Sequence, residues 1–226
     1  MWRQLVRALD RPYRFLDKEK RLAAFRKSTS VLFERAQELP NLEFRASQVA
    51  LYRHVEEKIL QGCSIDYLEF GVWEGETVRQ WTSINSSPHS RFFGFDTFEG
   101  LPEDWNAERQ KGNFDLGGRP PIIDDPRVSF ILGRFHESLP GFVETYKPRS
   151  RLVVHIDCDL YGSALCALTS CDRFLQPGSL VIFDEFYDIR NEYAAWQDYA
   201  RAYCREATGV CYAPGYTRVA LLIADR

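Results

Sequence analysis

The chain has 226 residues, of which 45% are hydrophobic, so it is long and apolar enough for one substantial domain but not for two. Its formal net charge of −3 gives no general attraction to nucleic acid or to an anionic membrane, and we expect no nucleic-acid partner. No apolar run approaches the roughly 20 residues that cross a bilayer, so no transmembrane segment is expected.

The first predicted element is a basic, amphipathic segment at the N-terminus. Trp2, Leu5 and Leu9 recur at helical spacing, with arginine residues between them. Such a segment packs on its own domain, packs on a second subunit, or lies on a membrane surface. We favour packing or partial disorder, because amphipathic helices are usually half-buried and terminal segments are often loose. The sequence leaves open whether the protein is a monomer or a homodimer.

Two more helices are predicted before the first strand. Lys18–Leu39 carries an apolar stripe and is followed by a proline. Arg45–Gln61 repeats apolar residues at four-residue steps, and Gly62 suits the end of a helix. We therefore divide the chain into an N-terminal helical extension, residues 1–62, and a main domain, residues 63–226.

The main domain opens with an apolar strand, an acidic residue and a glycine turn, in the segment SIDYLEFGVWEGET. Gly71 and Gly75 suit a tight turn where backbone approaches a ligand. Their spacing is not the G-x-G-x-x-G of dinucleotide-binding proteins, because Glu69 stands where that motif has its first glycine. A carboxylate repels phosphate, so a ligand with a positive or amine-bearing end fits better, and S-adenosylmethionine is such a ligand.

A second strand, in the segment RFFGFDTFEGLP, also ends in an acidic residue, Asp96. An acid about 20 residues beyond a glycine turn, at the tip of the next parallel strand, can accept hydrogen bonds from ribose hydroxyls. The alternative is a local turn around the same carboxylate, which Thr97 and Gly100 permit.

Residues 100–126 form a long polar segment with glycines, prolines and isolated aromatic residues. A loop of this length inside a compact domain is usually a lid, a binding loop or disordered. We predict a lid. Trp105 and Phe114 are candidates either for contact with a ligand or for anchoring the lid.

Two later apolar runs, LVVHIDCDLY and LVIFDEF, both end in carboxylates. The acidic residues are Asp157, Asp159, Asp184 and Glu185. Open parallel sheets bind ligands beyond the carboxyl ends of their strands, so these residues describe a site if the strands are neighbours. Crowded carboxylates repel one another unless a cation or a shared proton offsets the charge, and oxygen ligands favour Mg²⁺, Mn²⁺ or Ca²⁺. Taken singly, Asp159 and Glu185 are equally well read as solvated acids or helix N-caps.

The rest of the chain completes an α/β pattern with a mostly parallel sheet. The remaining elements that we predict are helices at Ser163–Phe174 and Glu192–Glu206, then a hairpin formed by Val210–Tyr212 and Thr217–Ala224. Alternating strands and helices that finish in a hairpin place one antiparallel strand near the edge of the sheet.

Four segments of the chain resemble one family. EFGVWEGET, GFDTFEGLPEDW, HIDCDLYGS and PGSLVIFDEF are similar to segments of the macrocin O-methyltransferase family, across roughly residues 67–186. Its members are class I S-adenosylmethionine-dependent enzymes that methylate hydroxyls of sugar moieties. The resemblance implies the class I methyltransferase fold, which is a Rossmann-like sheet with helices on both faces, and O-methylation of a sugar or a glycosylated small molecule.

The resemblance also implies which residues bind the cofactor. The glycine turn would hold its methionine end and Asp96 its ribose. The residues after a third strand, in the segment FILGRFHESLP, would lie near its adenine. The residues in question are Glu69, Gly71, Trp73, Gly75, Thr77, Asp96, Thr97, Gly133, Arg134, Phe135 and Asp157.

In the resembling family a divalent metal, which we expect to be Mg²⁺, is bound by positions that correspond to Asp157, Asp184 and Glu185. Asp159 corresponds to the family's proposed general base. Many members have Asp-Asp where this chain has Asp184-Glu185, so the role of the longer Glu185 stays open. His155 shares a strand face with Asp157. A core histidine with a satisfied hydrogen bond is the commoner arrangement, and a role supporting the site is the alternative. The candidate catalytic residues are Asp159, Asp157 and His155.

The six cysteines show no C-x-x-C pair and no regular spacing, which favours free thiols in a reducing compartment. The N-terminal segment lacks the uninterrupted apolar core of a secretory signal, so we predict a cytoplasmic protein. Two other functions stay open, namely methylation of a phenolic or catechol hydroxyl and a catalytically inactive, cofactor-binding interaction domain. Nicotinamide-dependent oxidoreduction is disfavoured by the glycine spacing.

Overall fold

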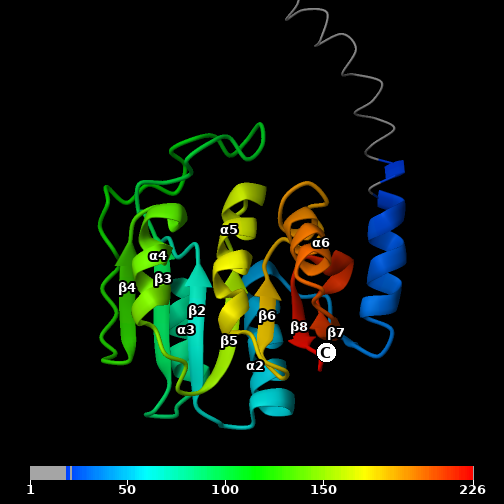
Figure 1. The fold of residues 1–226 in the computed structure, drawn as a ribbon, viewed down its shortest axis with the longest axis horizontal. Coiled ribbons are helices and arrows are strands. Elements are labelled where there is room, and N and C mark those ends of the chain that lie inside the picture. Colours follow the sequence, from blue (N-terminus) through cyan, green and yellow to red (C-terminus); the bar gives the residue numbers. More distant parts are fainter. Residues whose placement is uncertain (1–18, 21, 226) are drawn as a thin grey trace, which may run out of the picture.

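The structure is a computed structural model that describes residues 19–20 and 22–225, and its centre is an eight-stranded sheet (Figure 1). The strands are β1 Gln37–Glu38, β2 Ile65–Phe70, β3 Arg91–Asp96, β4 Val128–Leu132, β5 Arg151–Ile156, β6 Leu180–Phe183, β7 Ala207–Tyr212 and β8 Val219–Ile223. Their order across the sheet is β1-β7-β8-β6-β5-β2-β3-β4, and only β8 runs antiparallel to its neighbours. The predicted mostly parallel sheet with a C-terminal antiparallel hairpin is confirmed.

Helices cover both faces of this sheet. The labelled helical segments are α2 Phe44–Val55, η1 Glu56–Leu60, α3 Glu76–Ile84, α4 Phe135–Thr145, α5 Tyr161–Cys171, η2 Asp172–Phe174, α6 Glu192–Ala202 and η3 Pro214–Tyr216. In Figure 1, α4, α5 and α6 lie in front of the sheet, and α2 and α3 lie behind it. Each face has its own hydrophobic core, so the sheet separates two packed layers.

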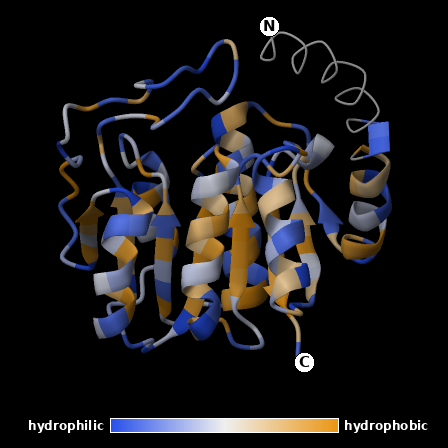
Figure 2. Ribbon diagram, turned by 45° about the horizontal axis from the view of Figure 1, so that its top comes forward, coloured by the Kyte–Doolittle hydropathy of each residue, from blue (hydrophilic) through white to orange (hydrophobic). Residues whose placement is uncertain are grey.

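The central strands are apolar because helices bury both of their faces. All six residues of β2 and all four of β6 are buried, as are five of the six residues of β5. In Figure 2 β6 is mainly orange, whereas the long loop after β3 is mainly blue and white. Near-continuous apolar runs of this kind are typical of parallel strands, which is why the sequence located them correctly.

The region before β2 is joined to the same sheet. β1 pairs in parallel with β7, and α2 packs against β7, β8 and α3. Residues 22–32 are also helical. Phe33, directly after them, belongs to the hydrophobic core between the sheet and helices α4, α5 and α6. The division of the chain at residue 62 stays a prediction. The amphipathic segment at the N-terminus lies outside the described residues, and none of the helices within them is both long and apolar enough to span a bilayer.

The sequence pattern did not predict the helix α4. Pro140 and Gly141 lie in its middle, and both residue types usually argue against a helix interior. The predicted helix at Arg45–Gln61 is present as α2 and η1, which together span Phe44–Leu60, and the next residue, Gln61, has a left-handed φ of 51°. In α4, tertiary packing thus overrides local propensity. In the helix predicted at Arg45–Gln61, each boundary differs from the prediction by only one residue.

Gly71 lies where β2 passes very close to the end of β5. Its φ is +91°, and a Cβ atom at this position would lie 1.8 Å from the carbonyl oxygen of Asp157. Gly71→Ala therefore combines backbone strain with a clash, and we expect it to lower the free energy of unfolding by about 3 kcal/mol. Equilibrium urea denaturation measures this change.

Gly141→Ala is the matched control, because Gly141 is helical and a Cβ atom there meets nothing within 4 Å. We expect this substitution to raise the free energy of unfolding by about 0.5–1 kcal/mol. A Gly71→Ala protein as stable as the wild type would mean that the close approach of β2 and β5 is unimportant for stability.

Candidate functional site

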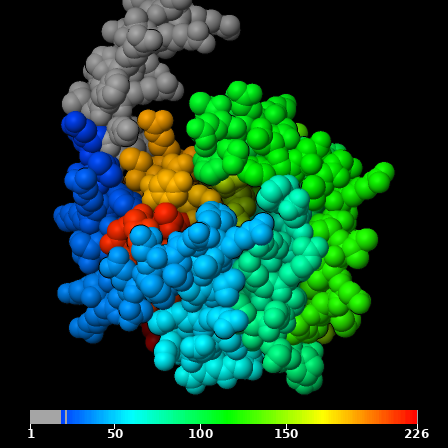
Figure 3. Space-filling model, turned by 180° about the vertical axis from the view of Figure 1, so that it is seen from behind, coloured from blue at the N-terminus to red at the C-terminus, as the bar shows by residue number. Residues whose placement is uncertain are grey.

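The site lies beyond the carboxyl ends of four neighbouring parallel strands, β6, β5, β2 and β3. Hydrogen bonds join these ends in series, since Gly71 N–H donates to Phe95 O, Asp157 N–H to Phe70 O, and Asp184 N–H to Ile156 O. A cavity of about 850 Å³ lies against them. In Figure 3 a recess is visible where the long loop after β3, the region of α2 and the segment after β6 meet. Its size and its place suit a small-molecule site in an open α/β sheet.

Asp96 fastens the glycine turn to the end of β3. Its Oδ2 accepts hydrogen bonds from the backbone N–H groups of Val72 and Trp73, at 2.8 and 2.9 Å. Its Oδ1 accepts one from Phe98 N–H at 2.9 Å, which is the local turn that the sequence also permits. Each carboxylate oxygen has two lone pairs, so Asp96 can hold the turn and still accept a hydrogen bond from a ligand in the cavity.

Glu69 is not part of the cavity wall. It is fully buried in β2, where Oε1 accepts a hydrogen bond from Thr77 Oγ1 at 2.5 Å and Oε2 accepts one from Tyr67 Oη. Thr77 lines the cavity and so connects Glu69 with it. Direct contact of Glu69 with a ligand stays a prediction.

The other predicted cofactor residues divide into two groups. Those that line the cavity are Gly71, Trp73, Thr97, Arg134, Phe135 and Asp157. Gly75 and Gly133 lie outside the lining. A Cβ atom on Gly75 would lie 2.9 Å from Pro121, so this glycine allows the loop after β3 to pack on the turn.

Four carboxylates gather at the ends of β5 and β6, as the sequence predicted, and line one side of the cavity. They are Asp157, Asp159, Asp184 and Glu185. Burial, and then the charge of Asp184, raise the pKa of Asp157 and that of Glu185 well above their usual values. The cluster therefore favours either protonation or a cation that offsets its charge.

A buried arginine that the sequence reading missed partly balances this charge. Arg218 Nε lies 2.7 Å from Asp184 Oδ1, and Arg218 Nη2 lies 3.2 Å from Asp184 Oδ2, with both side chains buried. Gln48 Nε2 lies 3.5 Å from the same Oδ1. The available signal in the sequence was an arginine inside the apolar run Thr217–Ala224. Arg218 offsets one carboxylate and leaves the charges of the others.

Glu192 is a second residue that the sequence reading missed. It is fully buried at the start of α6, and it accepts hydrogen bonds from Cys158 N–H at 3.4 Å and from Glu185 N–H at 3.1 Å. One carboxylate thus fastens the loop after β5 to the loop after β6. No sequence pattern indicates this role, because an acid in the first turn of a helix is common.

Asp159 lies in the cavity wall with an unusual backbone. Its φ of 62° is in the left-handed region, which a non-glycine residue rarely adopts and which occurs preferentially at functional sites. Burial raises the pKa of Asp159 to about 7, the charge of Asp184 adds to this shift, and the guanidinium of Arg109 opposes it. A carboxylate with a pKa near neutrality suits proton transfer.

The long loop after β3 crosses the opening of the cavity. Trp105 Nε1 donates a hydrogen bond to Asp188 Oδ2 at 3.1 Å, which connects this loop with the segment after β6. Phe114 meets the ring of Trp73 edge-to-face, with 5.2 Å between the ring centroids. Both aromatic residues line the cavity, so their predicted anchoring and contact roles are compatible.

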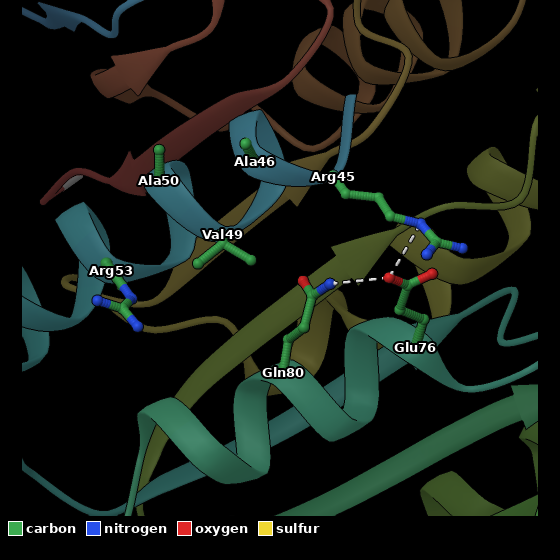
Figure 4. Close-up of a pocket in the computed structure, with 7 residues that line it drawn as sticks. All are labelled: Arg45, Ala46, Val49, Ala50, Arg53, Glu76 and Gln80. Carbon is green, nitrogen blue, oxygen red and sulfur yellow. Dashed lines mark hydrogen bonds and ion pairs between the residues drawn. The ribbon is translucent and has the colours of Figure 1, made fainter. Parts of the chain in front are cut away.

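A separate depression lies between α2 and α3 (Figure 4). Figure 4 shows Arg45 and Gln80 both reaching Glu76, at 3.3 and 3.4 Å. Its remaining lining consists of the small apolar residues of α2 and Arg53. The acid cluster and the glycine turn border the larger cavity and not this depression.

The acid cluster fits a divalent cation. Three buried polar atoms near it, which are Tyr52 Oη, His155 Nε2 and Glu185 Oε2, have no hydrogen-bond partner among the described residues. His155, Asp157 and Asp184 each offer one ligand atom, and these atoms all lie within 4.8 Å of one another. Buried polar atoms without partners, beside carboxylates in excess, are the features expected of a cation site.

Comparison with known proteins identifies a relative and a family. The Streptomyces olivaceus protein 8-demethyl-8-(2,3-dimethoxy-alpha-L-rhamnosyl)-tetracenomycin-C 4'-O-methyltransferase is 31% identical over 157 residues, which cover 58% of this chain and 57% of that protein. The chain thus matches just over half the length of this curated relative.

Similar solved structures show the same fold. Calicheamicin methyltransferase CalS11 matches with a TM-score of 0.60 and 22% identity over 80% of this chain and 78% of that one. The O-methyltransferase NovP matches with a TM-score of 0.59 and 20% identity over 79% and 80%. A Bacillus cereus O-methyltransferase solved in complex with SAH matches with a TM-score of 0.52 and 15% identity over 91% of each chain.

The family model described as methyltransferase domain matches residues 68–186, which is more than half of the chain and includes the glycine turn and both acidic strand ends. The predicted methyltransferase fold is confirmed by these structures. The protein therefore belongs to the methyltransferase domain family.

Proposed function

We propose that the protein is an S-adenosylmethionine-dependent, divalent-metal-assisted O-methyltransferase that acts on a hydroxyl of a sugar or a glycosylated small molecule. Family membership supports the reaction class. The acceptor class is supported by the Streptomyces olivaceus relative, whose name describes methylation of a rhamnosyl-tetracenomycin. CalS11 is itself described as a TDP-rhamnose 3'-O-methyltransferase, and its apo structure matches with a TM-score of 0.53.

One observation carries this proposal, namely that Asp96 and the acid cluster lie on the walls of the same cavity. Asp96 stands at the strand end where an acid meets ribose hydroxyls in related folds. The carboxylates at the ends of β5 and β6 lie where a hydroxyl acceptor and a cation would be needed. A cofactor and an acceptor bound in this cavity would therefore be neighbours.

The residues of the chain have distinct roles in the proposed reaction. S-adenosylmethionine supplies a methyl group on a sulfonium, and the acceptor supplies a hydroxyl oxygen that must lose its proton. Asp159 takes this proton, because it lies in the cavity wall and its pKa is about 7. Asp96 orients the donor through its ribose, and Glu69 keeps Thr77 in position at the turn.

A bound divalent cation would be held by Asp157 and Asp184, with Glu185 in the same wall, and would favour the alkoxide form of a bound hydroxyl. We propose Mg²⁺ or another divalent ion.

The lid, residues 100–126, would exclude water from the reacting groups. Six unpaired cysteines support a reducing, cytoplasmic location. We also propose residue 62 as the boundary between the N-terminal extension, residues 1–62, and the main domain, residues 63–226.

Methyl transfer to a panel of acceptors tests the proposed function. The panel contains nucleotide-linked and aglycone-linked deoxysugars on one side and catechols on the other, and mass spectrometry detects the methylated product. We expect products from the sugar acceptors only. Methylation of catechols alone would favour the phenolic alternative, and no methylation in the presence of cofactor binding would favour an inactive domain.

Removal of metal tests the cation. Because a bound cation contributes several kcal/mol to charge stabilisation in such reactions, we expect EDTA treatment to lower turnover by about 100-fold or more. Added Mg²⁺ or Mn²⁺ should restore it. Turnover that survives complete chelation, checked by elemental analysis of the protein, would contradict a role for metal.

A further inference from the structure

His155 is a buried side chain in β5 with one engaged and one free ring nitrogen. It is fully buried, Nδ1 lies 2.7 Å from Tyr67 Oη, and Nε2 has no hydrogen-bond partner among the residues that the structure describes. Nearly all buried polar atoms in native proteins have a partner. The free Nε2 therefore points to a bound species that is not part of the chain.

The hydrogen bonds on the other side of the ring fix its tautomer. Tyr67 Oη donates its single hydrogen to Glu69 Oε2, so toward His155 it acts as an acceptor. Thr77 Oγ1 donates to the other oxygen of Glu69, which keeps Glu69 an acceptor. In the neutral imidazole the proton is therefore on Nδ1, and Nε2 presents a lone pair.

One ring nitrogen of His155 lies beside two carboxylates, and Nε2 is the nitrogen that Tyr67 does not engage. The ligand atoms of His155, Asp157 and Asp184 are within 4.8 Å of one another. Bonds of about 2.1 Å to one cation bring ligands to about 3–4 Å from one another, so a small movement of the side chains suffices. The pair between Arg218 and Asp184 does not prevent this, because each oxygen of a carboxylate accepts twice.

We propose that His155 is a nitrogen ligand of the cation in this site, so that the site is a His–Asp–Asp site that prefers Mn²⁺ or another transition metal to Mg²⁺. The inference rests on the proposed function for the presence of a cation. It adds a ligand that the resemblance does not imply, and it gives Tyr67 and Glu69 a role as the chain that orients this ligand. A histidine that binds metal usually donates its other N–H to such a group.

The nitrogen ligand changes which metals the site selects. Mg²⁺ prefers oxygen ligands and near-ideal octahedral geometry, whereas imidazole suits first-row transition metals. An oxygen-only site formed by Asp157, Asp184 and Glu185 would not have this preference for transition metals over Mg²⁺. Metal selectivity and the atoms bound to the metal therefore distinguish the two ligand sets.

Spectroscopy of Mn²⁺ bound to the full-length protein, without cofactor or acceptor, tests the proposal. Electron spin-echo envelope modulation should show ¹⁴N coupling from one imidazole in the wild type. His155→Asn keeps a donor toward Tyr67 but removes Nε2, so the coupling should disappear and Mn²⁺ affinity should fall by about 10- to 100-fold. The fall in Mg²⁺ affinity should be smaller.

Two further variants serve as controls. His136→Asn removes a histidine that lines the same cavity but is exposed, and the ¹⁴N coupling should persist. Tyr67→Phe should keep the coupling and weaken Mn²⁺ binding about tenfold, because it removes only the orienting group. Thermal unfolding monitored by circular dichroism shows whether each variant is folded.

The spectra of the wild type and of His155→Asn, together with the affinity for Mn²⁺, decide the proposal. Bound Mn²⁺ without nitrogen coupling, coupling that persists in His155→Asn, or no Mn²⁺ binding at millimolar concentration would each overturn the proposal. Methyl transfer is assayed with Mg²⁺ in the same preparation. An active enzyme without nitrogen coupling would reject only the role of His155, whereas an inactive one with nitrogen coupling would reject only the proposed reaction.

Discussion

Asp159→Asn should lower kcat by about 100- to 10,000-fold, the range expected when a general base is removed. Asparagine has nearly the same size and accepts a hydrogen bond, but it cannot take a proton from a hydroxyl. The left-handed backbone at this position also tolerates asparagine, so the fold should be retained. Steady-state kinetics with a sugar acceptor, together with calorimetric titration of S-adenosylhomocysteine, measures both effects.

The affinity for S-adenosylhomocysteine should change by no more than about twofold in Asp159→Asn, because the base acts on the acceptor. Asp225→Asn, at an exposed carboxylate outside the cavity, is the control for the loss of one negative charge, and it should be as active as the wild type. Full activity of Asp159→Asn would assign the base to another residue.

Asp96→Ala should raise the dissociation constant of S-adenosylhomocysteine by about 10- to 100-fold. The substitution removes a hydrogen bond to ribose that involves a charged group, worth about 1.5–3 kcal/mol. It also frees the backbone N–H groups of Val72 and Trp73, so the glycine turn loses its attachment to β3. Isothermal titration calorimetry measures the affinity directly.

Asp96→Asn separates these two effects. It keeps one oxygen for the turn but loses the charge, so its affinity should be intermediate. NAD⁺ titrated against the wild type should show no binding, because the glycine spacing disfavours a pyrophosphate. An unchanged affinity for S-adenosylhomocysteine in Asp96→Ala would place the cofactor elsewhere in the cavity.

The sequence predicts those parts of the molecule whose pattern has one physical cause. β2, β5 and β6 are buried on both faces, so their apolar runs are continuous and their ends are marked by acids. Because parallel strands end at one edge of a sheet, the meeting of Asp96 and Asp157 at one cavity follows from the strand assignments.

Contacts between distant segments were not predictable in the same way. The pair between Arg218 and Asp184 depends on β8 inserting antiparallel beside β6, and sequence spacing does not specify that neighbour. Glu69 was expected in the cavity, yet its strand face directs it to Tyr67 and Thr77. The helix α4 was missed because Pro140 and Gly141 oppose it locally, while packing of the helix on the sheet supplies what they lose.

The double attachment made by Glu192 has a consequence for motion within the enzyme. Since a single buried carboxylate accepts hydrogen bonds from the amides of both Cys158 and Glu185, the two acidic loops are coupled and should move together if residues 100–126 act as the proposed lid. Spacing between the proton acceptor and the cation ligands would then survive each cycle of substrate entry and product release. Mobility can accordingly be concentrated in residues 100–126, leaving the chemical groups rigid throughout turnover.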